Sequence, residues 1–171
     1  MRRVRYVVVT SLDGYIAGPN GEADWIVTDP DVDFGELFNQ FETALVGRKT
    51  FEAMVKAGRT SMPGIRFFVF SRTLRQEEYP QVTIVAEQAK EVVTQLREKP
   101  GKDIWLFGGG ALFSSLASEG LVDTVELAVM PVLLGNGLPV APNLAHQINL
   151  TLTGHKLYKK TGIVSLQYAI K

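Results

Sequence analysis

The 171-residue chain contains no cysteine and only two histidines, His146 and His155. The absence of cysteine excludes disulfides, thiolate nucleophiles and every zinc site that depends on sulfur ligands. Two histidines are too few for a histidine-rich metal site, so we expect no bound metal. Eighteen Lys and Arg balance eighteen Asp and Glu. Without a positive excess, neither nucleic acid nor a membrane surface is an expected partner.

Long hydrophobic runs are also missing. The apolar run near the basic N-terminus covers only residues 6–9 and stops at Thr10. A secretory signal needs roughly 7–15 apolar residues and a membrane helix about 20. We therefore expect a cytoplasmic protein. The hydrophobic fraction of 46% is average for a globular protein, and the length suits one domain over residues 1–171.

Strand-like and helix-like segments alternate along the chain. The pattern predicts strands at residues 4–9, 44–46, 66–70, 82–85, 104–107, 124–132, 155–159 and 163–170, the last two as a hairpin. It predicts helices at residues 33–41, 50–57, 88–98 and 111–118. The alternation followed by antiparallel-looking strands indicates α/β class, with a single three-layer α/β/α domain and a mixed, mostly parallel sheet.

The strongest local feature is a predicted strand that runs into Gly108, Gly109 and Gly110, from which a helix begins. Such a junction exposes backbone N–H groups at a helix N-terminus, where an anion is stabilised by hydrogen bonds and by the helix dipole. The alternative is a tight turn without a ligand. A Rossmann fingerprint fits poorly because Phe113 stands where its third glycine belongs. A P-loop is excluded because no Gly-Lys-Ser/Thr follows.

Two other predicted strands end in groups suited to anions. One ends at Gly47 and is followed by Arg48, Lys49 and Thr50; another ends before Ser71 and Arg72. Each alone is equally compatible with solvated cations and a helix cap. Ligands of open α/β sheets gather at the carboxyl ends of strands, so together the three turns favour one extended ligand with several phosphates. A serine and an arginine at such a place suit a ribose 2′-phosphate, which distinguishes NADPH from NADH.

Taken together, the motifs resemble the dihydrofolate reductase-like superfamily. Within it, the chain is similar to the reductase domain of the bifunctional riboflavin-biosynthesis deaminase-reductase. The resemblance runs nearly end to end and rests on S-L-D-G-Y-I-A at 11–17, D-W-I at 24–26, L-V-G-R-K-T-F at 45–51, S-R-T-L at 71–74, G-G-G-A-L-F at 108–113, L-V-D-T-V-E-L at 121–127 and P-V-L-L-G-N-G at 131–137.

The resemblance implies a reductase that binds NADPH. It assigns Gly47, Arg48 and Thr50 to the cofactor phosphates and Ser71 and Arg72 to the 2′-phosphate. By the same likeness, residues at the third turn pass under the pyrophosphate, and two residues after the first strand contact the nicotinamide. The third-turn residues are Gly108, Gly109, Gly110, Ala111 and Leu112, and the nicotinamide residues are Ile16 and Ala17.

The chain departs from its relatives mainly on the substrate side. Folate reductases carry a carboxylate early in the first helix, and the nearest equivalents here are Asp31 and Asp33, which could equally be helix caps. With Trp25 they are the candidate substrate residues. The N-P-x-L-T segment usual in riboflavin reductases is replaced by residues 49–52. The His-x-Glu and Pro-Cys-x-x-Cys motifs of the deaminase do not occur.

The sequence thus predicts a stand-alone NADPH-dependent reductase of a small heterocycle, similar to 5-amino-6-(5-phosphoribosylamino)uracil reductase. The catalytic proton could come from solvent, Asp31 or Asp33, so no catalytic residue is assigned. Alternatives are a dihydrofolate or pterin reductase, a non-catalytic NADPH-binding protein and an oligomeric scaffold. The apolar stretch 121–134 and the C-terminal hairpin favour a homodimer.

Overall fold

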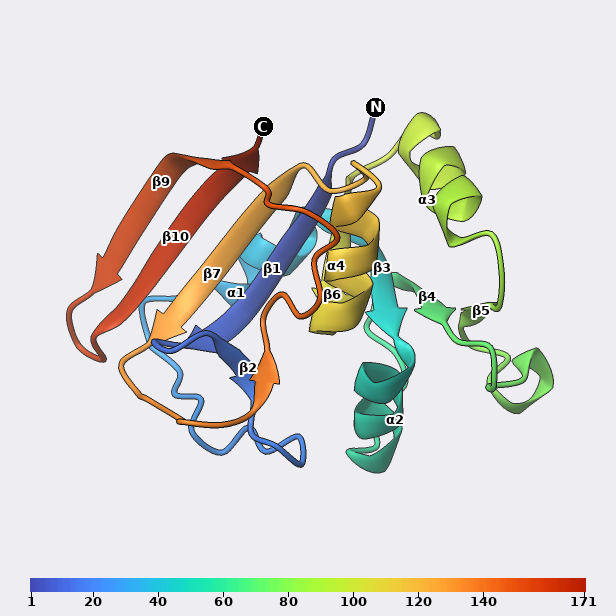
Figure 1. The fold of residues 1–171 in the computed structure, drawn as a ribbon. Helices are drawn as coiled ribbons and strands as arrows, with labels where there is room; N and C mark the ends of the chain where they lie inside the picture. The colour runs from blue at the N-terminus through green and yellow to red at the C-terminus, as the bar shows by residue number, and fades with distance from the viewer.

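The computed structural model describes residues 1–171 and is built on one eight-stranded sheet of order β5-β4-β3-β6-β1-β7-β10-β9 (Figure 1). Its strands are β1 (Val4–Ser11), β3 (Phe41–Gly47), β4 (Arg66–Phe70), β5 (Thr83–Val85), β6 (Asp103–Gly108), β7 (Thr124–Met130), β9 (Leu150–Tyr158) and β10 (Ile163–Ile170). Six neighbouring strands, from β5 to β7, run parallel, and β10 pairs antiparallel with both β7 and β9. The predicted mixed, mostly parallel sheet is confirmed.

Helices cover both faces of the sheet, which makes the three-layer fold. They are α1 (Phe34–Asn39), α2 (Arg48–Lys56), α3 (Ala89–Glu98) and α4 (Gly110–Ser118), with the short 3-10 helix η1 (Gln76–Glu78). Side chains of α3 and α4 pack in one buried core with Val4, Tyr6 and Leu106 of the sheet. Side chains of α1 and α2 pack in a second core around Trp105 on the opposite face. In Figure 1, α4 crosses in front of β1 and β6, and α1 lies behind the sheet.

Several predicted boundaries are corrected by the structure. The first helix ends at Asn39 rather than at Phe41, because Phe41 begins β3 and is buried against Trp105. The strand predicted at 155–159 is longer and starts at Leu150. A small two-stranded sheet of β2 (Tyr15–Ala17) and β8 (Leu138–Pro139) was not predicted, because strands of three and two residues have no readable periodicity.

The hairpin predicted at the C-terminus is confirmed, with Tyr158 opposite Ile163 and the turn between them. Its two strands extend the sheet past β7, where no helix lies on the α3 and α4 side of the sheet (Figure 1). None of the helices is both long enough and apolar enough to cross a membrane.

Candidate functional site

The three turns that the sequence singled out follow neighbouring strands. β4, β3 and β6 lie side by side and run parallel, so their carboxyl ends meet at one edge of the sheet. The register pairs Gly47 with Phe70 and Val46 with Gly108. The residues that come next, including Ser71 and Gly109, therefore begin at the same level. The three turns therefore lie at one edge of the sheet.

The second and third turns also touch each other directly. A Cβ placed on Gly47 would lie 3.3 Å from the Gly109 nitrogen and 3.7 Å from Leu112 Cβ. A Cβ on Gly109 would lie 3.2 Å from Thr50 Oγ1 and 4.0 Å from Ile16 Cδ1. Glycine at 47 and 109 therefore lets two backbones approach beside a hydroxyl and an apolar side chain. Three segments far apart in sequence contribute to this cluster.

Both helices that leave the cluster have glycine at the N-cap. Gly47 caps α2 and Gly109 caps α4, and neither helix has a side-chain hydrogen bond at this end. The first amide groups of a helix lack partners within the helix, and a bound anion can supply the missing acceptors. Two nine-residue helices thus present uncapped positive ends at one edge of the sheet. This arrangement fits a ligand with two or more phosphate groups.

The third glycine of the triplet has a different surrounding. Gly110 is buried, and a Cβ there would collide with the Pro139 carbonyl oxygen and lie 2.7 Å from Pro142 Cδ. This glycine is required by packing of the chain against the start of α4 rather than by space for a ligand. Gly108 alone of the three has a positive φ, of 147°. Ala111, the next residue, is exposed at the start of α4.

The two arginines of the cluster differ in their partners. Arg48 Nη1 lies 3.0 Å from Glu52 Oε1, an ion pair one helical turn apart with both side chains about 40% exposed, at 41% and 40%. Arg72 is exposed and forms no hydrogen bond or ion pair within the chain. The neighbouring Ser71 is buried, and its hydroxyl accepts hydrogen bonds from the amides of Thr73 and Leu74. Ser71 therefore shapes the turn that presents Arg72.

The candidate substrate residues lie in the segment between β2 and α1. Asp33 is the N-cap of α1 and accepts a hydrogen bond from Glu36 N at 2.8 Å. Asp31 is exposed and pairs with Lys160 at 2.8 Å. Trp25 is half-buried and donates from Nε1 to the Glu22 carbonyl. These contacts hold the segment, and none of them joins it to the glycine cluster, so the substrate assignments stay predictions.

Two acidic residues with lowered pKa values were not singled out by the sequence reasoning. Asp29 is buried, accepts a hydrogen bond from Thr161 Oγ1 at 2.6 Å, and this bond lowers the pKa of its carboxyl group. Asp13 accepts a hydrogen bond from Ser11 Oγ, which lowers its pKa to about 2. Asp29 and Thr161 are far apart in the sequence, and no local pattern predicts such a contact. The D-G dipeptide at Asp13 signalled only a turn.

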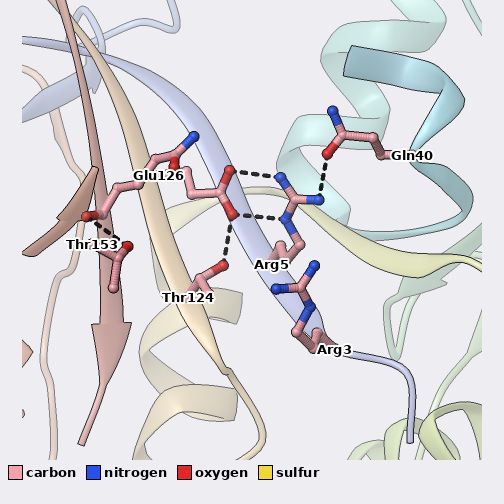
Figure 2. Close-up of a pocket in the computed structure, with 7 residues that line it drawn as sticks. Arg3, Arg5, Gln40, Thr124, Glu126 and Thr153 are labelled. Carbon is pink, nitrogen blue, oxygen red and sulfur yellow. Dashed lines mark hydrogen bonds and ion pairs between the residues drawn. The ribbon is translucent and has the colours of Figure 1, made fainter. Parts of the chain in front are cut away.

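A separate polar cavity of about 260 Å³ lies at the amino ends of β1 and β7, away from the glycine cluster (Figure 2). Arg5 forms a two-point ion pair with Glu126, at 2.7 and 2.8 Å, and also donates to Gln40. The hydrogen bond to Glu126 raises the pKa of the Arg5 guanidinium. The arginines at this cavity are already paired, Arg3 with Asp103 and Arg5 with Glu126 and Asp103. We therefore interpret these residues as a structural network.

With this geometry established, comparison with known proteins decides the family. The RibD C-terminal domain family model matches residues 2–164. The chain belongs to the RibD C-terminal domain family. The uncharacterized Bacillus subtilis protein YyaP is 35% identical over 179 residues, covering 98% of this chain and 94% of YyaP. The riboflavin biosynthesis protein RibD of Corynebacterium ammoniagenes is 25% identical, and the match spans 46% of that longer protein.

Solved structures agree with this assignment. A Shewanella sp. PV-4 protein assigned to riboflavin biosynthesis superposes with a TM-score of 0.84 at 24% identity, over 100% of this chain and 99% of the other. The deaminase/5-amino-6-(5-phosphoribosylamino)uracil reductase of Thermotoga maritima gives 0.73 at 18% identity, over 99% of this chain and 57% of that one. Dihydrofolate reductase of Enterococcus faecalis, solved with NADP(H), gives 0.67 at 16% identity, over 99% and 96%. The chain has the dihydrofolate reductase-like fold that the motifs predicted.

Proposed function

We propose that this member of the RibD C-terminal domain family is an NADPH-dependent reductase of a small heterocycle. The observation that carries the proposal is the pair of glycine-capped helix starts, at Gly47 and Gly109, which face each other at the ends of adjacent parallel strands. A dinucleotide spans several strands and carries phosphates that such helix starts bind. Family membership supports the same conclusion independently.

The residues at this edge fit NADPH in chemical type. The phosphates would lie between the two helix starts. They would be held by the Gly47 backbone, the Thr50 hydroxyl and residues 108–112. Arg48 would add a cation once its contact with Glu52 is exchanged. Arg72 would bind the 2′-phosphate, since a guanidinium is suited to bind phosphate oxygens. Ser71 would hold the turn that presents Arg72 to this phosphate.

Ile16 and Ala17 would contact the nicotinamide ring, because Ile16 lies beside Gly109 at the far end of the cluster. When bound, the cofactor supplies the hydride, so the chain's own task is to orient the substrate and exclude water. The proposed substrate is a pyrimidine of the class that the Thermotoga maritima reductase name specifies. Trp25, Asp31 and Asp33 are the residues proposed to contact it.

Two measurements test the proposal. Addition of NADPH is expected to raise the Tm of the protein, since a ligand that binds only the folded state stabilises it. Oxidation of NADPH, followed by absorbance, is then expected with a hydride acceptor from a panel of phosphoribosylaminopyrimidines and oxidised pterins. An unchanged Tm at millimolar NADPH would contradict the proposal. Binding without oxidation of NADPH by any panel member would favour a non-catalytic binding protein.

We also propose that the chain forms a homodimer through the face of β7, β10 and β9 that no helix covers. Register places apolar side chains on this face in rows such as Leu157–Val164–Val129 and Leu152–Tyr168–Val125, although Val125 is itself buried in the core. Leu152 and Leu157 are 52% and 56% exposed. The alternation of the three strands puts no Lys, Arg, Asp or Glu on this face. Apart from His155 the exposed side chains of this face are mainly apolar, and such a surface is suited to a second copy of itself.

The area of this face is consistent with a dimer. Three strands of about eight residues cover about 400 Å² when laid flat, at about 4.8 Å between strands and 3.3 Å per residue. This is within the roughly 300–600 Å² of the largest apolar patch on a typical monomer, a patch that is often functional. Two such faces packed about 10 Å apart would form a sandwich of sheets, and their corrugated surfaces approach the ~1,000 Å² that a specific interface buries.

A further inference from the structure

Asp13 lies in the turn between β1 and β2, and its carboxylate is occupied by three donors. Ser11 Oγ donates to it at 2.6 Å, Leu134 N at 3.1 Å and Gly135 N at 2.8 Å. No cation pairs with this carboxylate. Two of the three donors come from the connection after β7, more than 100 residues away in sequence. The carboxylate therefore joins two distant segments at one point.

The same carboxylate acts on β2 through Ser11. The Ser11 hydroxyl is buried, gives its single proton to Asp13, and its oxygen accepts a hydrogen bond from Tyr15 N at 3.0 Å. Backbone bonds close the loop on either side, from Leu12 N to the Val132 carbonyl and from Val140 N to the Gly14 carbonyl. Residues 132–140 consequently wrap around the β1–β2 turn.

The segment of residues 132–140 contacts both β2 and the start of α4. Within it, β8 pairs with β2, and Gly137 packs closely against the Ala17 carbonyl. Val140 accepts a hydrogen bond from the buried Tyr6 hydroxyl at 2.9 Å, and the Pro139 carbonyl packs on Gly110. One segment thus contacts both the strand that carries Ile16 and the helix that begins beside Gly109. The position of β2 relative to α4 depends on how this segment is held.

We propose that Asp13 is a positioning residue that holds β2, and with it Ile16 and Ala17, against the Gly109 turn at the nicotinamide end of the cofactor site. The inference rests on the proposed function for its cofactor. An aspartate is required because three donors converge on acceptor-only oxygens; an asparagine would turn an N–H group toward other N–H groups. Asp13 touches neither cofactor nor substrate in this arrangement, and it acts through β2.

Binding of two probes to Asp13→Asn tests this role. One probe is NADPH, and the other is adenosine 2′,5′-bisphosphate, which carries the 2′-phosphate but no nicotinamide. We expect the variant to bind NADPH about tenfold more weakly, which is about the contribution of one hydrogen bond to a charged group. Affinity for the bisphosphate should change less than about twofold, because Arg72 and Ser71 lie on the other side of the cluster. Glu98→Gln, which removes an exposed carboxylate of α3, should leave both affinities unchanged.

Parallel weakening of both probes would overturn the proposal, since it would show a general structural defect, and unchanged binding of both would overturn it as well. Ser11→Ala provides a second variant, because it removes the link from Asp13 to Tyr15 N and should give the same difference between probes. Both variants should be compared at equal folded fraction, checked by thermal melting.

Hydrogen exchange of the protein without ligand separates this inference from the proposed function. In Asp13→Asn the amides of Tyr15, Leu134 and Gly135 should exchange faster, while the amides of α3 keep their protection. Unchanged protection in β2 would overturn the positioning role. If the wild-type protein binds neither probe, the proposed function and the cofactor part of this inference fail together, whereas the exchange result still shows whether Asp13 holds β2.

Discussion

Two arginines at the proposed cofactor edge, Arg48 and Arg72, differ in the partners they have within the chain. Arg48 is held by Glu52 on its own helix, so binding a phosphate there requires exchange of one anion for another. Arg72 has no such partner and stands exposed after the buried Ser71. A free guanidinium gains the full charge-assisted contact when a phosphate arrives. Arg72 is thus the residue on which the choice between NADPH and NADH is expected to depend.

Replacement of Arg72 by Ala should therefore weaken NADPH binding by roughly 1–3 kcal/mol, the value of a charged hydrogen bond. NADH lacks the 2′-phosphate, so its affinity should hardly change. Isothermal titration with each cofactor measures the difference. Arg75→Ala, which removes a nearby exposed arginine, is the matched control and should not discriminate between cofactors. Equal losses for NADPH and NADH would contradict the role given to Arg72.

At the scale of elements, prediction from the sequence succeeded where each strand or helix has a strong local pattern. β4 and β10 match their predicted bounds, because β-branched and aromatic runs fill buried strands. The predicted strand at 155–159 lacks the first five residues of β9, L-T-L-T-G at 150–154. This part contains a glycine, and its pairing with β10 is irregular beside Gln167. β2 and β8 were missed because only pairing across the fold makes them strands.

The candidate site divides in the same way. The glycine turns were predicted because strand, glycine and helix follow one another in the sequence. Their direct contact, from Gly47 to Gly109 and from Thr50 to Gly109, could not be predicted, since it depends on β3 and β6 being neighbours. The contacts of Asp13 with Leu134 and Gly135 could not be predicted for the same reason, because these partners lie 121 and 122 residues away. The sequence predicts which turns carry groups suited to a ligand. Which of these turns lie in contact depends on the order of the strands in the sheet.

The contact between the two helix starts leads to a prediction for Gly109. Its φ of −93° is open to any residue, so Gly109→Ala should fold. The added Cβ would face Thr50 Oγ1 at 3.2 Å and occupy the space between the two helix starts. NADPH affinity should fall at least about tenfold, measured by titration, with little change in Tm. Gln95→Ala, at an exposed position of α3, is the control, expected to leave both Tm and NADPH binding nearly unchanged.

The polar network at the amino ends of the strands gives a prediction about stability. Arg5 and Glu126 are 9% and 10% exposed in their side chains and hold β1 to β7 with Gln40 nearby (Figure 2). Glu126→Gln removes the two-point carboxylate partner of a buried guanidinium, which keeps only Asp103 at 3.4 Å as a counter-charge, and should destabilise the fold by about 2 kcal/mol. Urea unfolding measures the change. Glu119→Gln, which breaks the exposed pair with Lys90, should have a much smaller effect; an equal loss would contradict the structural reading.

For the whole molecule, the β7-β10-β9 extension has two faces of opposite character. One face carries the paired charges of Figure 2, including Glu126, and the other carries Leu152, Leu157 and the aromatic ring of Tyr168. A sheet that faced water on both sides would not need the second face to be apolar. No helix covers that face (Figure 1), and its exposed β9 leucines are the part that the proposed dimer would bury. The cofactor edge lies at the other half of the sheet and stays open in such a dimer.

Adjacent residues on β9 permit a matched test of the dimer. Leu152 belongs to the apolar face, and Thr153, beside the irregular pairing of the strand, lines the polar cavity on the other. Leu152→Lys would place an ammonium group inside the proposed interface without a partner, at a desolvation cost that a dimer of this size cannot absorb. Sedimentation velocity should find a dimer for the wild-type protein and for Thr153→Lys, and a monomer for Leu152→Lys. The Tm of the wild-type protein should also rise with protein concentration, and that dependence should vanish in Leu152→Lys, because only an associating fold is stabilised by mass action. A monomeric wild-type protein, or dissociation by both lysine variants alike, would show that this face is not the interface.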